Sequence, residues 1–110
     1  MKAKRLYNYE PDYAVPPGET LREVIDSMEM THAEFATRLD VTPVSLSRIL
    51  NGDQPITYQT AERLEMVTGV PARFWNELEA NYRAQIAKLE AQERLQDDLD
   101  ETRSGYYKRG

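Results

Sequence analysis

Two short helices, each with its own start signal, follow one another within residues 31–52, and this pair constrains the fold more than any other feature of the chain. Thr31 and Glu34 have the spacing of a capping box, in which a hydroxyl and a carboxylate each accept a hydrogen bond from a backbone N–H at the helix start. Thr42 followed by Pro43 predicts a second start, because a hydroxyl cap precedes a proline whose missing N–H costs nothing in the first turn.

The second helix is predicted to end at Asn51-Gly52, since both residues tolerate the left-handed backbone of a C-terminal cap. Asp40 forms the corner and can adopt a positive φ at modest cost. Two capped helices joined by a tight corner make a helix-turn-helix, which places one helix in a DNA groove. Each half has one apolar face at three-to-four spacing, made by Phe35, Ala36, Leu39, Val41, Leu46, Ile49 and Leu50.

This segment resembles the helix-turn-helix of the phage-repressor-like (XRE) family. Ala36 lies where that family keeps a small residue so that the two helices can touch, and the run Ser47-Arg48-Ile49-Leu50-Asn51-Gly52 is similar to the end of its recognition helix. The family usually has glycine at the corner, where this chain has Asp40. The resemblance implies a DNA-binding domain whose recognition helix spans residues 42–51.

Outside the motif, further positions match one branch of that family: Pro16-Pro17-Gly18-Glu19-Thr20-Leu21, Ile56-Thr57, Ala61, Arg63, Leu64, the run from Pro71 to Leu78, and Asn81-Tyr82. With these positions, residues 16–87 resemble the HigA/VapI branch. The resemblance implies a homodimer that binds a palindromic operator, often encoded beside a small basic ribonuclease toxin of the HigB type and able to neutralise it. Other chains of this style are stand-alone repressors or the front end of longer proteins.

The patterning along the chain predicts an all-α fold, a five-helix phage-repressor-like domain with a C-terminal helical extension. We expect an N-terminal arm at 1–15, which holds Tyr7, Tyr9 and Tyr13, and a helix-turn-helix domain at 16–87. An acidic helical extension is expected at 88–103 and a flexible tail at 104–110. The tyrosines of the arm either dock a partner or fold back onto the domain.

If residues 42–51 form the recognition helix, the side chains opposite its apolar face point outward. Arg48 is the strongest candidate for reading a base, because a guanidinium can bond O6 and N7 of guanine together. Val44 could contact a thymine methyl group, and Pro43 and Ser47 complete the outward set. Asn51, at the end of the helix, is a further candidate for DNA contact. The alternative for Arg48 is an ordinary solvated arginine.

Phosphate contacts are expected at the helix starts. His32 can donate a hydrogen bond to a phosphate from the first helix of the motif, or it can be an exposed residue without a role. Further hydroxyl donors are Thr31, Thr42, Ser45 and Ser47, although both threonines already serve as caps.

The net charge of −5 is unusual for a DNA-binding chain, and residues 31–56 hold two arginines against three acidic residues. Weak non-specific DNA binding is therefore expected. The chain has no cysteine and one histidine, which argues against a disulfide frame and a structural metal. We also expect no cofactor. The chain has neither a membrane-length apolar run nor a catalytic motif, so we expect a cytoplasmic protein that is not an enzyme.

Two features outside the motif each have a sharp and a plain interpretation. Phe74, Trp75 and Tyr82 could form an aromatic cage, but at helical spacing we assign them to the core. Residues 88–101 carry two basic and six acidic side chains, which either bind a basic partner or form a solvated face. The second function class is therefore a protein-interaction module that masks a basic partner and binds DNA weakly.

Overall fold

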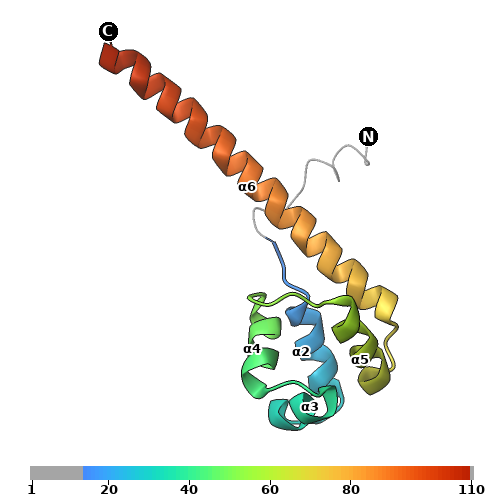
Figure 1. Cartoon of the computed structure of the whole chain (residues 1–110). Helices are drawn as coiled ribbons and strands as arrows, with labels where there is room; N and C mark the ends of the chain where they lie inside the picture. The colour runs from blue at the N-terminus through green and yellow to red at the C-terminus, as the bar shows by residue number, and fades with distance from the viewer. Residues whose placement is uncertain (1–13, 110) are drawn as a thin grey trace. The chain divides into compact units, whose positions relative to one another are not determined.

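The computed structural model describes residues 14–109 of the chain, and the tyrosines of the expected N-terminal arm, Tyr7, Tyr9 and Tyr13, lie outside that range. The described residues form five helices joined by short connections and contain no strand, which confirms the all-α prediction (Figure 1). They divide into a compact unit, Val15–Arg83, and a second unit that takes in α6 from Ala84 onward. The helices are α2 Gly18–Ser27, α3 His32–Leu39, α4 Pro43–Asn51, α5 Tyr58–Thr68 and α6 Ala72–Arg109.

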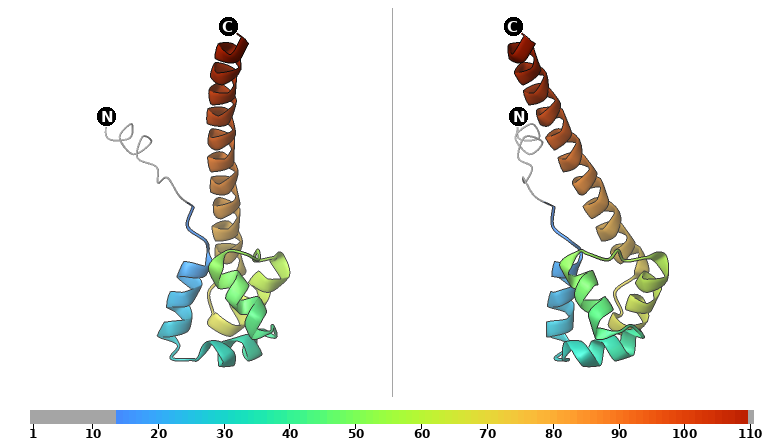
Figure 2. Two further views of the ribbon diagram at one scale, coloured as in Figure 1. Left: turned by 90° about the vertical axis from the view of Figure 1, so that its left-hand side faces the viewer. Right: turned by 60° about the vertical axis from the view of Figure 1, so that its left-hand side comes forward.

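The helix α2 begins directly after Pro17, as the Pro-Pro-Gly-Glu run predicts, and no side chain caps it. Leu21 and Ile25 on its apolar face are fully buried. The connection to α3 turns at Glu29, whose φ of 57° is left-handed, a feature without a glycine signal in the sequence. Figure 2 shows α2 beside α4, the helix that carries most of the candidate DNA contacts.

The caps of α3 and α4 are those that the sequence predicts. Thr31 Oγ1 accepts a hydrogen bond from Glu34 N at 3.1 Å, and the Glu34 carboxylate accepts one from Thr31 N at 2.9 Å. At the start of α4, Thr42 Oγ1 accepts a hydrogen bond from Ser45 N at 3.0 Å. Gly52 ends α4 with a φ of 84°. Local sequence signals therefore set the limits of both motif helices.

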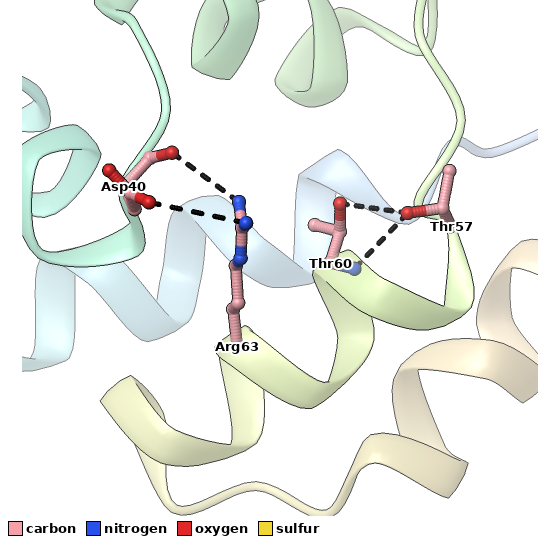
Figure 3. Close-up of polar contacts among 4 residues, drawn as sticks. All are labelled: Asp40, Thr57, Thr60 and Arg63. Atoms are coloured by element: carbon pink, nitrogen blue, oxygen red, sulfur yellow. Dashed lines mark hydrogen bonds and ion pairs between the residues drawn. The ribbon is translucent and has the colours of Figure 1, made fainter.

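Asp40 makes the corner between α3 and α4 in the left-handed conformation, with φ 63° and ψ 44°. Beyond it, Val41 N donates a hydrogen bond to Ala36 O at 3.0 Å, which closes the turn. Arg63 of α5 reaches this corner: its Nη2 lies 4.0 Å from Asp40 Oδ2, and its Nη1 donates to Asp40 O at 3.4 Å (Figure 3). The carboxylate that replaces the usual glycine is thus met by a cation from another helix.

Asp40→Gly is expected to raise the free energy of unfolding by about 0.5–1 kcal/mol. Glycine removes the cost of a left-handed L-residue, roughly 1–2 kcal/mol, and part of that gain is lost to the larger freedom of the unfolded chain. The lost pair with Arg63 subtracts little, because the Asp40 side chain is 88% exposed. Urea denaturation of both chains measures the difference, and a loss above 1 kcal/mol would show that the Arg63 contact outweighs the backbone strain.

The core of the Val15–Arg83 unit gathers the apolar faces of all the helices that enter it. Trp75 is fully buried, as we expected. Phe74 is 39% exposed, so its assignment to the core is wrong: adjacent helical residues point about 100° apart, and only Trp75 faces inward. The buried apolar residues are Leu21, Ile25, Phe35, Ala36, Leu39, Leu46, Ile49, Leu50, Ile56, Ala61, Leu64, Ala72 and Trp75.

The helices α5 and α6 meet around Gly69, which ends α5 with a φ of 80°. Thr57 caps the start of α5, where its Oγ1 accepts a hydrogen bond from Thr60 N at 3.1 Å (Figure 3). Glu65 then caps α6, because its Oε1 accepts a hydrogen bond from Ala72 N at 2.9 Å. This second cap joins two helices that the sequence presents as separate.

The helix α6 continues through the acidic residues to Arg109. Residues 104–109 are therefore helical backbone, whereas we expected helix only to residue 103; this segment has no proline to interrupt the backbone hydrogen bonds of the helix. The flexibility of this end stays a prediction. Residues 90–102 are all exposed, including Leu95 at 62% and Leu99 at 50%.

Candidate nucleic-acid interface

The helix α4 buries one face and exposes the other. Leu46, Ile49 and Leu50 are at most 3% exposed, and α4 packs through them against α2 and α3. The opposite face is open to solvent, with Val44 63% exposed. The residues predicted to point outward are all exposed: Pro43, Val44, Ser47 and Arg48. Asn51, the further candidate at the end of the helix, is exposed as well.

The Arg48 side chain is free to reach a ligand. It forms no hydrogen bond or ion pair with any residue of the described chain, while its carbonyl oxygen accepts hydrogen bonds from Asp53 N at 2.8 Å and Gln54 N at 3.2 Å. The backbone at Arg48 is therefore held by the loop that follows α4. A fixed backbone and an unengaged guanidinium are what a base-reading arginine requires.

Thr31 and His32 lie at the start of α3 and are both exposed. The Thr31 hydroxyl oxygen is engaged in the capping box, as is that of Thr42 in the cap of α4. The two helix starts retain backbone N–H groups that favour anions. Contacts from Thr31, His32 and Thr42 to phosphate remain predictions.

Ser45 differs from the exposed set because its side chain is partly buried and already bonded. Its Oγ accepts a hydrogen bond from Gln54 Nε2 at 2.8 Å. Gln54 lies in the loop after α4, and sequence reasoning missed it. No local pattern could have revealed it, because the pair depends on how the loop folds back along the helix.

Arg22 is a second residue that sequence reasoning missed. Its Nη2 donates a hydrogen bond at 3.1 Å to Oδ1 of Asn51, the last residue of α4, although the two are 29 positions apart. Arg22 lies on the exposed side of α2, so its guanidinium retains donors for solvent or phosphate. The fold thus adds a positive charge beside a motif that is acidic by its own residues.

The charges near the motif remain mixed. Asp53 follows α4 and Glu34 lies in the first turn of α3, and both are exposed. The described residues contain no group of three or more acidic, histidine or cysteine side chains placed to hold a metal ion. Within the same residues, no helix is long and apolar enough to span a membrane.

Comparison with known proteins places the motif in a family. The family model described as Helix-turn-helix matches residues 21–75, which include α3 and α4. The helix-turn-helix-type transcriptional regulator YddM of Escherichia coli is 30% identical over 63 residues, which are 57% of this chain and 67% of that protein.

Solved structures extend the similarity over more of the chain. An addiction module antidote protein of a HigA family from Coxiella burnetii is 28% identical with a TM-score of 0.67, covering 77% of this chain and 94% of that one. The Pseudomonas aeruginosa antitoxin HigA, solved with the higBA promoter, is 25% identical with a TM-score of 0.68, covering 74% and 90%. The chain is a DNA-binding regulator rather than an enzyme, and it belongs to the XRE-type helix-turn-helix family.

Proposed function

We propose that the chain is a transcriptional repressor that inserts α4 of each subunit of a homodimer into successive major grooves of a palindromic operator. The observation that carries this proposal is the exposed face of α4, where Arg48 is unengaged and Val44 stands open beside the exposed Ser47. In helix-turn-helix dimers the half-sites lie about one helical turn apart, roughly 10 base pairs. The DNA-binding domain would comprise residues 16–87.

We further propose that the repressor is the antitoxin of a HigBA-type module. The similarity to HigA proteins supports this role. The extension at residues 88–103 supports it as well, because its exposed acidic side chains suit a small basic ribonuclease toxin. The test is co-expression with the product of the adjacent reading frame: a basic toxin-like frame whose growth arrest this chain relieves supports the antitoxin, and a neighbour without such an effect leaves a stand-alone repressor.

A protein-interaction module with weak DNA binding is the second candidate function. The acidic extension favours it, since Leu95 and Leu99 are exposed among carboxylates and could pack on a partner. A gel-shift assay at low salt decides between the candidates. Selection of a palindromic sequence from random duplexes supports the repressor, whereas no shift together with capture of a small basic protein supports the interaction module.

Arg48→Ala is expected to lower affinity for the selected duplex by about 10–100-fold and to relax discrimination at one base position per half-site. Loss of a bidentate guanine contact is worth roughly 1–3 kcal/mol, whereas non-specific binding depends on phosphates and should change little. Fluorescence anisotropy with every single-base permutation of the duplex measures both effects.

The matched control is Arg73→Ala, which removes the same charge from an exposed site on α6 outside the motif. It should leave the ranking of the permutations unchanged. Equal ranking by the wild type and the Arg48 variant would show that Arg48 reads no base.

A further inference from the structure

We propose that Gln54 is a positioning residue that turns the Ser45 hydroxyl into a dedicated hydrogen-bond donor for a DNA phosphate oxygen. The inference rests on the proposed DNA-binding function and deepens it. It explains how a motif with an acidic side-chain balance can still hold the DNA backbone.

The bond between the two side chains is well supported by its surroundings. Gln54 Nε2 lies 2.8 Å from Ser45 Oγ, and both residues are partly buried. The Gln54 backbone is tied to the same helix, because Gln54 N donates to Arg48 O at 3.2 Å. Gln54 is therefore attached to α4 at two points, by its backbone N and by its side-chain amide, and this attachment limits the rotation of the Ser45 side chain.

The bond leaves the proton of the Ser45 hydroxyl without an acceptor. A serine hydroxyl carries one proton and can accept two hydrogen bonds, and Gln54 uses one of the acceptor positions. Some helical hydroxyls of this chain donate back to a carbonyl, as Ser27 Oγ does to Val24 O at 2.7 Å and Thr68 Oγ1 does to Leu64 O at 2.7 Å. Ser45 makes no such bond among the described residues. Its proton is thus available to an external acceptor.

The position of Ser45 favours a phosphate as that acceptor. Val44 and Arg48 lie at the centre of the exposed face of α4, and Ser45 lies on its flank, partly covered by the loop. When a helix enters the major groove, its central side chains meet base edges and its flanks face the sugar-phosphate backbone. A neutral hydroxyl whose oxygen already accepts a hydrogen bond is a better donor, since linked hydrogen bonds polarise one another.

Gln54→Glu tests the direction of the bond. A carboxylate can only accept, so the Ser45 hydroxyl should donate to it and become unavailable to DNA, while the side chains stay bonded. On a duplex selected by the wild type from a random 20-base-pair pool, we expect Gln54→Glu to weaken binding about tenfold more in the wild-type background than in the Ser45→Ala background, where only the added charge acts. Fluorescence anisotropy gives the four affinities.

Ser47→Ala provides the matched control, because Ser47 is an exposed serine of the same helix with no bond to Gln54. Its effect should be the same with and without Gln54→Glu. Melting temperatures within a few degrees of the wild type would show that all variants remain folded. A purely structural role for Gln54 predicts a fall in melting temperature and equal effects in both serine backgrounds.

Phosphate recognition is tested separately with duplexes that carry one neutral methylphosphonate at each backbone position. At one position per half-site, Ser45→Ala should cost nothing further, since the acceptor charge is already absent. The phosphate assignment would be overturned if the affinity cost of Ser45→Ala disappeared only on a duplex with a changed base and on none with a methylphosphonate. The positioning role would be overturned if Gln54→Glu lowered the affinity equally in the wild-type and Ser45→Ala backgrounds. If the wild type enriches no duplex at all, the proposed function itself fails.

Discussion

Trp75→Ala is expected to lower the free energy of unfolding by about 3–5 kcal/mol, the usual cost of emptying a large aromatic site in a core. Trp75 is the largest fully buried side chain of the described residues. Small domains have only about 5–15 kcal/mol of stability in total, so the variant should be partly unfolded at 37 °C. Because Trp75 is the only tryptophan, unfolding is best followed by circular dichroism.

Two further variants test whether the loss of stability comes from burial at position 75 or from removal of any aromatic ring. Phe74→Ala should lower the free energy of unfolding by about 1 kcal/mol or less, since Phe74 is 39% exposed. Its ring does pack edge-on against Trp75, with 5.4 Å between the ring centroids. Trp75→Phe should fall between the two, because it retains most of the apolar volume and removes an indole N–H that is buried without a partner. Equal losses in the Phe74→Ala and Trp75→Ala chains would contradict the burial argument.

The ends of α3, α4 and α5 could be predicted from the sequence because they depend on contacts a few residues apart. Thr31, Thr42 and Thr57 each cap the helix that follows, and Gly52 and Gly69 each end one. A cap needs only a hydroxyl and a free N–H within one turn, or a residue that accepts a left-handed backbone. Both requirements are visible in the order of the residues.

The outward face of α4 could be predicted for the same reason, since helical periodicity decides which side chains share a side. The contacts that cross between elements could not. Gln54 reaches Ser45 from a loop, and Arg22 reaches Asn51 from α2 across 29 positions. Such pairs depend on the packing of complete helices, which leaves no periodic signal in the sequence.

Phe74 shows where periodicity itself is too coarse. When two aromatic residues are consecutive, the apolar spacing of the helix fits burial of either one. The apolar face is wide enough to include both positions, so the pattern does not predict which ring is buried. The path of α6 against the core decides, and it buries Trp75. The exposure of Phe74 is consequently visible in the structure but could not be predicted from the apolar spacing.

Gly18→Ala is expected to destabilise the domain by about 3 kcal/mol, the upper part of the range for overpacking. In an exposed helix the same change would stabilise by roughly 0.5–1 kcal/mol, because alanine has the higher helix propensity. Gly18 is buried, and a Cβ at this position would lie 2.1 Å from Leu50 O and 2.4 Å from Leu50 C. Both are backbone atoms of α4, so no side-chain rotation can relieve the contact.

Gly18→Ala should also weaken DNA binding, because the clash between the new Cβ and the Leu50 backbone can be removed only if α2 moves away from the end of α4. Asn51, which follows Leu50, would lose its hydrogen bond from Arg22 on α2. Urea denaturation measures the stability, and anisotropy under conditions where the variant is folded should show weaker binding to the selected duplex.

Gly69→Ala is the matched control for this glycine. A Cβ there meets nothing within 4 Å, and only the φ of +80° opposes it, at a cost of roughly 1–2 kcal/mol. Gly69 lies outside the motif, so the affinity of the folded protein for DNA should be unchanged. A Gly18→Ala chain as stable as the wild type would show that α2 can withdraw from α4 without cost, and the close approach of the two helices would then have no part in holding the recognition helix.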